Sequence, residues 1–113
     1  PRMVQVDRCC RDTEKNMSYD IKHADRKFNY TYNVAKMWYA SKPEKGIRCF
    51  YGMNGKDALK EQREIRDYME LNRPEMLEFE PENGWGDYQG ALDFVNRLIA
   101  SSLAGPDDIW DGD

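Results

Sequence analysis

The hydrophobic period of this chain changes from two to about 3.6 partway along, and this change constrains the fold more than any other feature. Over residues 19–32, apolar and polar residues alternate, which is typical of strands with one buried face. Over residues 56–71 and 88–103, apolar residues recur at the i, i+3, i+4 spacing of amphipathic helices. This order predicts an α+β domain in which an N-terminal β-hairpin packs against three to four helices.

The expected hairpin consists of two alternating runs around a polar turn. Tyr19, Ile21 and His23 share one face of the first run, with polar residues on the other face. The turn is predicted at residues 24–27. The second run then places aromatic residues at every other position, namely Phe28, Tyr30 and Tyr32.

Capping residues and prolines place the ends of the predicted helices. Asn33 is expected to cap a helix that begins at Val34, and Pro43 should end it by Ser41 because a residue before proline is restricted to extended conformations. One helical turn is expected within residues 44–51.

The C-terminal half contains two further helix starts. Pro74 suits the first position of a short helix, and Asp87 suits the N-cap of the long helix over residues 88–103. Gly105 and Pro106 should close this last helix.

The length of 113 residues fits one domain, and 40% hydrophobic residues are too many for a disordered chain. We expect a weakly ordered arm over residues 1–16, the α+β domain over residues 17–105 and an acidic tail over residues 106–113. Within the tail, Ile109 and Trp110 either pair as a short strand or dock loosely.

The sequence predicts a soluble, cytoplasmic protein. No segment has the apolar length of a membrane span, and residues 1–16 lack the apolar run of a signal peptide. Three cysteines, two of them adjacent, argue against a disulfide framework.

Charge is divided unequally along the chain. Residues 1–66 hold 15 Lys/Arg against 9 Asp/Glu, a balance of +6, whereas residues 67–113 hold 2 against 12, a balance of −10. Such asymmetry favours electrostatic steering toward a charged partner. The alternative is that the two halves attract each other across the fold.

The predicted partner-binding residues are acidic and aromatic side chains of the C-terminal half. Trp85 and Tyr88 flank a glycine-set turn, where a rigid aromatic pair ringed by acids could anchor an interface; alternatively, the glycines fold Trp85 back against the core. The full set is Glu75, Glu78, Glu80, Glu82, Trp85, Asp87, Tyr88, Asp107, Asp108, Trp110 and Asp111.

Other chemistry finds little support. The single histidine, His23, lies on the apolar side of its strand and is expected to be structural. Cys9, Cys10 and Cys49 lack the spacing of a common zinc site, and no nucleophile elbow or oxyanion loop accompanies a Cys–His pair. Basic residues over 42–66 form a weak nucleic-acid footprint, which the isoelectric point of about 5.1 opposes. We therefore predict no catalytic residue, metal, cofactor or direct nucleic-acid contact.

Two segments carry a resemblance to a family. They are Asn-Tyr-Thr-Tyr-Asn-Val at residues 29–34 followed by Met37 and Trp38, and Asn-Gly-Trp-Gly-Asp-Tyr at residues 83–88 followed by residues 90–92. Together they resemble a family of small uncharacterised proteins encoded by tailed phages and bacterial genomes. The resemblance implies a phage accessory gene, and thus the host-cell cytoplasm, but no activity.

The leading hypothesis is a non-enzymatic module that binds a protein partner. In its sharper form, the acidic surface inhibits a basic, nucleic-acid-binding host defence protein by imitating phosphates. The alternatives are a small hydrolase that uses the carboxylate clusters, with or without a metal, and a minor structural protein of a virion.

Overall fold

The N-terminal hairpin forms the middle and one edge of an antiparallel sheet. The computed structural model describes residues 18–82, 84 and 86–112. Strand β1 (Ser18–His23) pairs with β2 (Arg26–Thr31) on one side and with β3 (Trp110–Gly112) on the other, so the order of the described strands is β2-β1-β3. The predicted arm over residues 1–16 lies outside the described residues.

The hairpin turn is shorter than the pattern predicts. His23 pairs directly with Arg26, which leaves only Ala24 and Asp25 in the turn, and Ala24 takes the left-handed conformation with φ of 58°. Arg26 belongs to the strand because its Nε donates a hydrogen bond to Ser101 Oγ at 2.7 Å, a contact far away in sequence.

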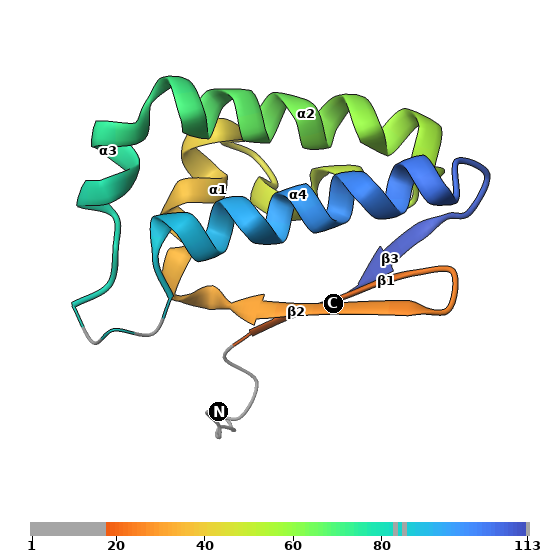
Figure 1. The fold of residues 1–113 in the computed structure, drawn as a ribbon, viewed down its shortest axis with the longest axis horizontal. Helices are drawn as coiled ribbons and strands as arrows, with labels where there is room; N and C mark the ends of the chain where they lie inside the picture. The colour runs from red at the N-terminus through yellow and green to blue at the C-terminus, as the bar shows by residue number, and fades with distance from the viewer. Residues whose placement is uncertain (1–17, 83, 85, 113) are drawn as a thin grey trace.

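Four α-helices in the described part of the chain cover one side of the sheet (Figure 1). They are α1 (Ala35–Ser41), α2 (Gly55–Leu71), α3 (Arg73–Glu78) and α4 (Tyr88–Ala104), with short 3₁₀ helices at η1 (Tyr32–Val34) and η2 (Gly46–Phe50). The α+β class with an N-terminal hairpin on four helices is thus confirmed. No helix among these is both long and apolar enough to cross a membrane.

The core lies between the sheet and the helix layer, where α4 runs beside α2 (Figure 1). Helix α4 is buried along most of its length, including Phe94, Val95 and Leu98, and it packs on β2. Its broad apolar face is what the 3.6 period predicted. Burying one such side chain stabilises the fold by roughly 1.5–3 kcal/mol.

Of the two predicted helix caps, Asp87 is confirmed and Asn33 is not, and Asn54 is a further cap. Asp87 caps α4, because its Oδ1 accepts a hydrogen bond from Gly90 N at 2.6 Å. Asn54 caps α2 in the same way. The prediction for Asn33 is wrong: it lies within η1, where its backbone N–H donates to Thr31 Oγ1 at 3.1 Å, so Thr31 is the cap.

Residues 105–112 are an integral part of the fold. Gly55 N donates to Asp108 O, and Lys56 N donates to Pro106 O, both at 2.9 Å. These carbonyls satisfy N–H groups that the first turn of α2 would otherwise leave unpaired. The segment then continues into β3, so of the two behaviours open to Ile109 and Trp110, the structure shows a short strand beginning at Trp110.

Candidate partner-binding surface

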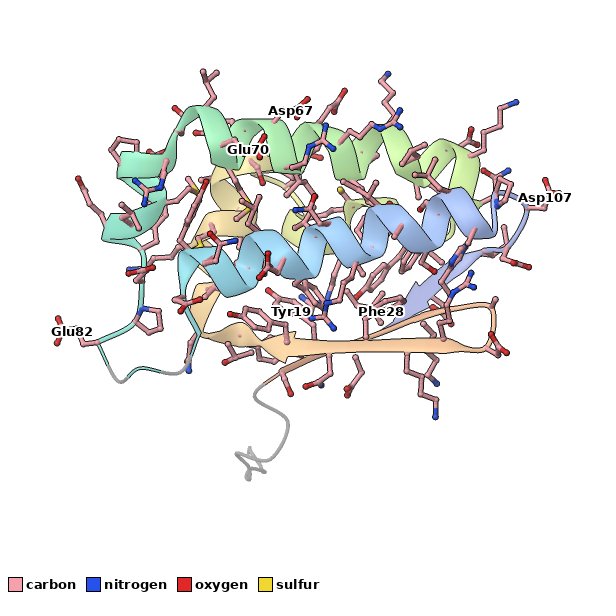
Figure 2. All side chains as sticks on the ribbon, in the orientation of Figure 1. Tyr19, Phe28, Asp67, Glu70, Glu82 and Asp107 are labelled. Carbon is pink, nitrogen blue, oxygen red and sulfur yellow. The ribbon has the colours of Figure 1, made fainter. Side chains whose placement is uncertain are left out.

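Exposed carboxylates gather at the end of the molecule formed by α3, the last turn of α2 and the loop after α3. We call Glu70, Glu75, Glu78 and Glu82 the acidic corner; all four are exposed. Figure 2 shows Glu82 at this end of the fold. Helix α3 is exposed along most of its length because Met76 is its buried residue. The corner therefore presents its charges on a projecting element.

The domain's own bases do not neutralise the acidic corner. Within the described residues, no Lys or Arg forms an ion pair with any of its four carboxylates. Glu75 accepts a hydrogen bond from Tyr68 Oη at 3.1 Å, which raises the pKa of Tyr68. Arg73 instead lies over the ring of Tyr88, 5.7 Å from its centre.

Two predicted carboxylates in the same region serve the fold. Glu80 Oε2 accepts a hydrogen bond from Tyr88 N at 2.8 Å, and Asp87 is the cap of α4. Both lie beside the acidic corner, but their oxygens already hold the start of α4 in place.

The structure does not bring the predicted acidic residues together. Figure 2 shows Asp107 at the end of the molecule opposite Glu82, and the molecule is 39 Å long. Asp108 follows Asp107 in the same turn, whereas Asp111 lies on β3 and lines the open side of the sheet. The set therefore separates into the acidic corner and a distant group in the tail.

The aromatic members of the predicted set do not form a described surface. Trp110 is fully buried and Tyr88 is 5% exposed, so neither side chain can meet a partner in this fold. Burial raises the pKa of the Tyr88 hydroxyl, and nearby Glu70 raises it further. Trp85 lies outside the described residues. Tyr88 and Trp110 are therefore core residues.

The two segments that carry the family resemblance contact each other. Tyr30 Oη accepts a hydrogen bond from Asp87 N at 3.2 Å. A Cβ at Gly90 would lie 2.3 Å from the same oxygen, and a Cβ at Gly86 would lie 2.7 Å from Thr31 Cγ2. Glycine at both positions thus lets the end of β2 pass close to the start of α4, which gives both motifs a structural purpose.

His23 is held in a closed polar cluster. Its Nδ1 lies 2.7 Å from Ser101 Oγ, and its Nε2 lies 3.1 Å from the Asp108 carbonyl. Because a carbonyl only accepts, the second bond requires the proton on Nε2, so Ser101 donates to Nδ1. The ring also stacks on Trp110, with centroids 4.2 Å apart. His23 is fully buried and Ser101 is 4% exposed. The cluster therefore joins the sheet to α4 through Ser101 and to the tail through the Asp108 carbonyl.

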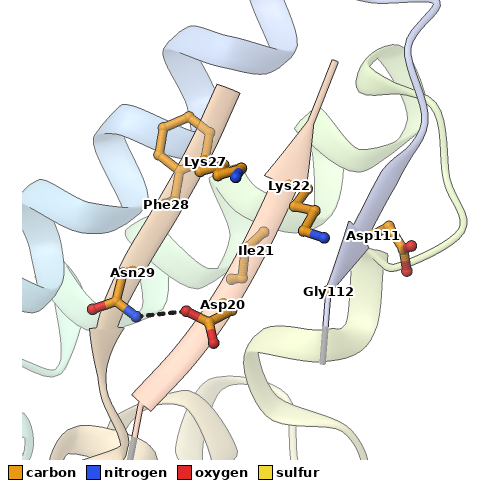
Figure 3. A pocket seen from close by; sticks show the side chains of 8 residues that line it. All are labelled: Asp20, Ile21, Lys22, Lys27, Phe28, Asn29, Asp111 and Gly112. Atoms are coloured by element: carbon orange, nitrogen blue, oxygen red, sulfur yellow. Dashed lines mark hydrogen bonds between the residues drawn. The ribbon is translucent and has the colours of Figure 1, made fainter. Parts of the chain in front are cut away.

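A shallow groove crosses the outer side of the sheet (Figure 3). It has a volume of about 690 Å³ and is open to solvent. Asn29 Nδ2 donates to Asp20 Oδ1 at 2.7 Å on its floor. Lys22 and Lys27 are direct cross-strand partners here. Its lining combines apolar surface with charged side chains of both signs, and its open shape does not enclose a ligand.

Among residues 18–112 as described, no group of three or more His, Cys, Asp or Glu side chains could hold a metal ion. Cys9 and Cys10 lie outside these residues. Cys49 is half-buried, and burial raises the pKa of its thiol to about 11, which keeps it protonated at neutral pH.

Sequence patterns missed the apolar part of the acidic corner. Leu71 is 82% exposed at the end of α2, and Leu77 is 37% exposed on α3. Periodicity does not show that α3 projects from the fold, so no sequence pattern marked either leucine as exposed. The available sequence signal for a separate projecting helix was Pro74, which lies in the first turn of α3, directly after the end of α2 at Leu71.

Comparison with protein-family models, curated proteins and solved structures finds no match for this chain.

Proposed function

We propose that this domain is a non-enzymatic binding module whose acidic corner contacts a basic protein. The observation that carries the proposal is a projecting helix with exposed carboxylates that the domain's own described bases leave unpaired. Like charges at one end of the molecule repel one another, and a basic partner relieves that repulsion.

The exposed leucines give the corner an apolar component. Leu71 and Leu77 lie among the carboxylates in sequence and on the same two elements. Interfaces commonly combine apolar contacts with a charged rim, the former supplying affinity and the latter steering and specificity.

A nucleic-acid-binding protein suits this surface best. Its binding groove is basic because it contacts phosphates, and carboxylates on a rigid helix can occupy such a groove in place of phosphates. A module seated there would compete with the nucleic acid, and it would therefore act as an inhibitor.

The test is affinity capture from the native host with two matched variants. One replaces Glu75, Glu78 and Glu82 by Gln; the other replaces Asp107, Asp108 and Asp111 by Asn at the other acidic group. Both remove three negative charges, so they differ only in position. We expect the wild type and the tail variant to retain the same basic partner, and the corner variant to lose it.

The captured complex should also dissociate as salt is raised, because exposed charge pairs are screened at high ionic strength. A partner retained equally by both variants, or a partner with a neutral surface, would refute the proposal.

A further inference from the structure

Helix α2 presents a charged outward face. Its buried positions include Ala58, Gln62 and Ile65, which place the opposite side of the helix in solvent. The exposed residues on that side follow helical spacing: Lys56, Lys60, Glu64, Asp67, Glu70 and Leu71. No described element covers this side of α2, so the stripe is open over the length of the helix.

The charges on this stripe change sign halfway along the helix. Lys56, Lys60 and Arg63 lie in the N-terminal half, and Glu64, Asp67 and Glu70 lie in the C-terminal half. An acidic residue in the first turn, such as Asp57, interacts favourably with the helix dipole, but the last turn contains the acidic Glu70 and no basic residue. Helix dipoles favour the reverse order, so this arrangement does not serve the stability of the isolated helix.

The charged stripe of one α2 is complementary to the stripe of a second α2 that runs in the opposite direction. If a second α2 lies antiparallel across this face, with the two-fold axis beside residues 63 and 64, Lys60 of one copy faces Asp67 of the other. Lys56 then faces Glu70, and the stem of Lys56 covers Leu71. Symmetry makes each of these contacts twice.

We propose that the domain forms a two-fold dimer through antiparallel pairing of α2 with α2 of a second copy. Charge complementarity selects this occupant, since a basic partner would repel the N-terminal half of the stripe and an acidic partner the C-terminal half. Glu64 is already bonded to Lys42, and Asp67 Oδ1 accepts from the neighbouring Arg66 at 3.0 Å. Both carboxylates are exposed, and each retains capacity to accept a further hydrogen bond. The dimer uses Glu70 and Leu71 at the edge of the acidic corner and leaves Glu75, Glu78 and Glu82 uncovered. The residues that test it, Lys60 and Asp67, lie outside the corner, so its failure can be told apart from failure of the proposed function.

The test is sedimentation equilibrium of the purified chain at concentrations from about 10 µM to about 1 mM, at low and high salt. We expect the mass to rise from 13.3 kDa toward twice that value at low salt, and the association constant to fall at least about tenfold at high salt.

Charge reversal identifies the surface. Lys60→Glu alone and Asp67→Lys alone should each weaken association at least about tenfold, because each places like charges opposite one another twice. An equimolar mixture of the two variants should recover association, since the reversed residues are then complementary in the mixed dimer. Lys27→Glu, which makes the same charge change on the sheet, should leave association unchanged.

Circular dichroism is the check that each variant is folded, and native spectra are expected because all three sites are exposed. A wild-type chain that stays monomeric at low salt overturns the proposal. The proposal is also overturned if both single variants associate as strongly as the wild type, or if the mixture of the two variants remains monomeric.

Discussion

Tyr30 of the hairpin lies so close to Gly90 of α4 that only the hydrogen atom of a glycine side chain fits between them. Gly90 lies in the first turn of α4, where alanine would ordinarily be favoured by up to about 1 kcal/mol. Here the added methyl group would meet Tyr30 Oη. We expect Gly90→Ala to lower the free energy of unfolding by about 1–3 kcal/mol, although alanine has the higher helix propensity.

A double-mutant cycle separates this clash from other effects. Tyr30→Phe removes the hydroxyl oxygen but keeps the ring stacked on Phe94. In that background, Gly90→Ala should cost less than half as much, as measured by urea denaturation. Equal costs in both backgrounds would show that Tyr30 is not the obstacle.

Cys49 allows a second test at the residue scale. With Cys9 and Cys10 replaced by serine, the alkylation rate at pH 8 reports Cys49 alone. Burial raises its pKa from 9.0 to about 11. The thiolate population, and with it the rate, should therefore be about 100-fold lower in the native protein than in urea. Equal rates in the two conditions would contradict the burial of this thiol.

At the scale of elements, Lys42 joins the end of α1 to α2. Its Nζ donates to Glu61 Oε1 at 2.9 Å and to Glu64. The bond to Lys42 lowers the pKa of Glu64 below its ordinary 4.5. A carboxylate with a lowered pKa in the folded state stabilises the fold above its unfolded pKa, and this stabilisation is lost as pH falls through the folded value.

We therefore expect Glu64→Gln to lower the free energy of unfolding by about 0.5 kcal/mol at pH 7, a small value because the pair is exposed. The difference from wild type should disappear as pH falls from about 4.5 to about 3. Glu44→Gln serves as the control, because Glu44 is exposed and forms no ion pair with the other described residues. A difference that persists at pH 3 would mean that the charge of Glu64 is not its cause.

The elements themselves could be predicted because each is encoded locally. Alternation marks β1 and β2, the 3.6 period marks α2 and α4, and the start of α4 is given by Asp87. The turn could not be placed, because Arg26 is held in the strand by Ser101, which is 75 residues away. Likewise, no local pattern pairs His23 with the Asp108 carbonyl.

At the scale of the whole molecule, charge along the sequence proved a poor guide to charge in space. The acidic half of the chain contains both Glu82 and Asp107, which lie at opposite ends of the fold (Figure 2). A sum over a segment cannot show this separation, because α4 carries the chain back across the molecule between them. The acidic corner could thus be proposed from sequence only as part of a larger set.

The burial of Trp110 makes the last residues a condition for folding of the whole domain. Its ring stacks on His23 and meets Phe50 edge-on at 5.1 Å, and its Nε1 donates to Ser102 Oγ at 2.9 Å. The same segment supplies the carbonyls that complete the start of α2. Trp110→Ala should therefore lower the free energy of unfolding by about 3–5 kcal/mol, measured by urea denaturation with far-ultraviolet circular dichroism. Ile109→Ala, at the adjacent residue that is 55% exposed, should cost less than about 1 kcal/mol. Similar costs at the two positions would mean that the tail docks only at the surface, and α2 and the sheet would then fold without it.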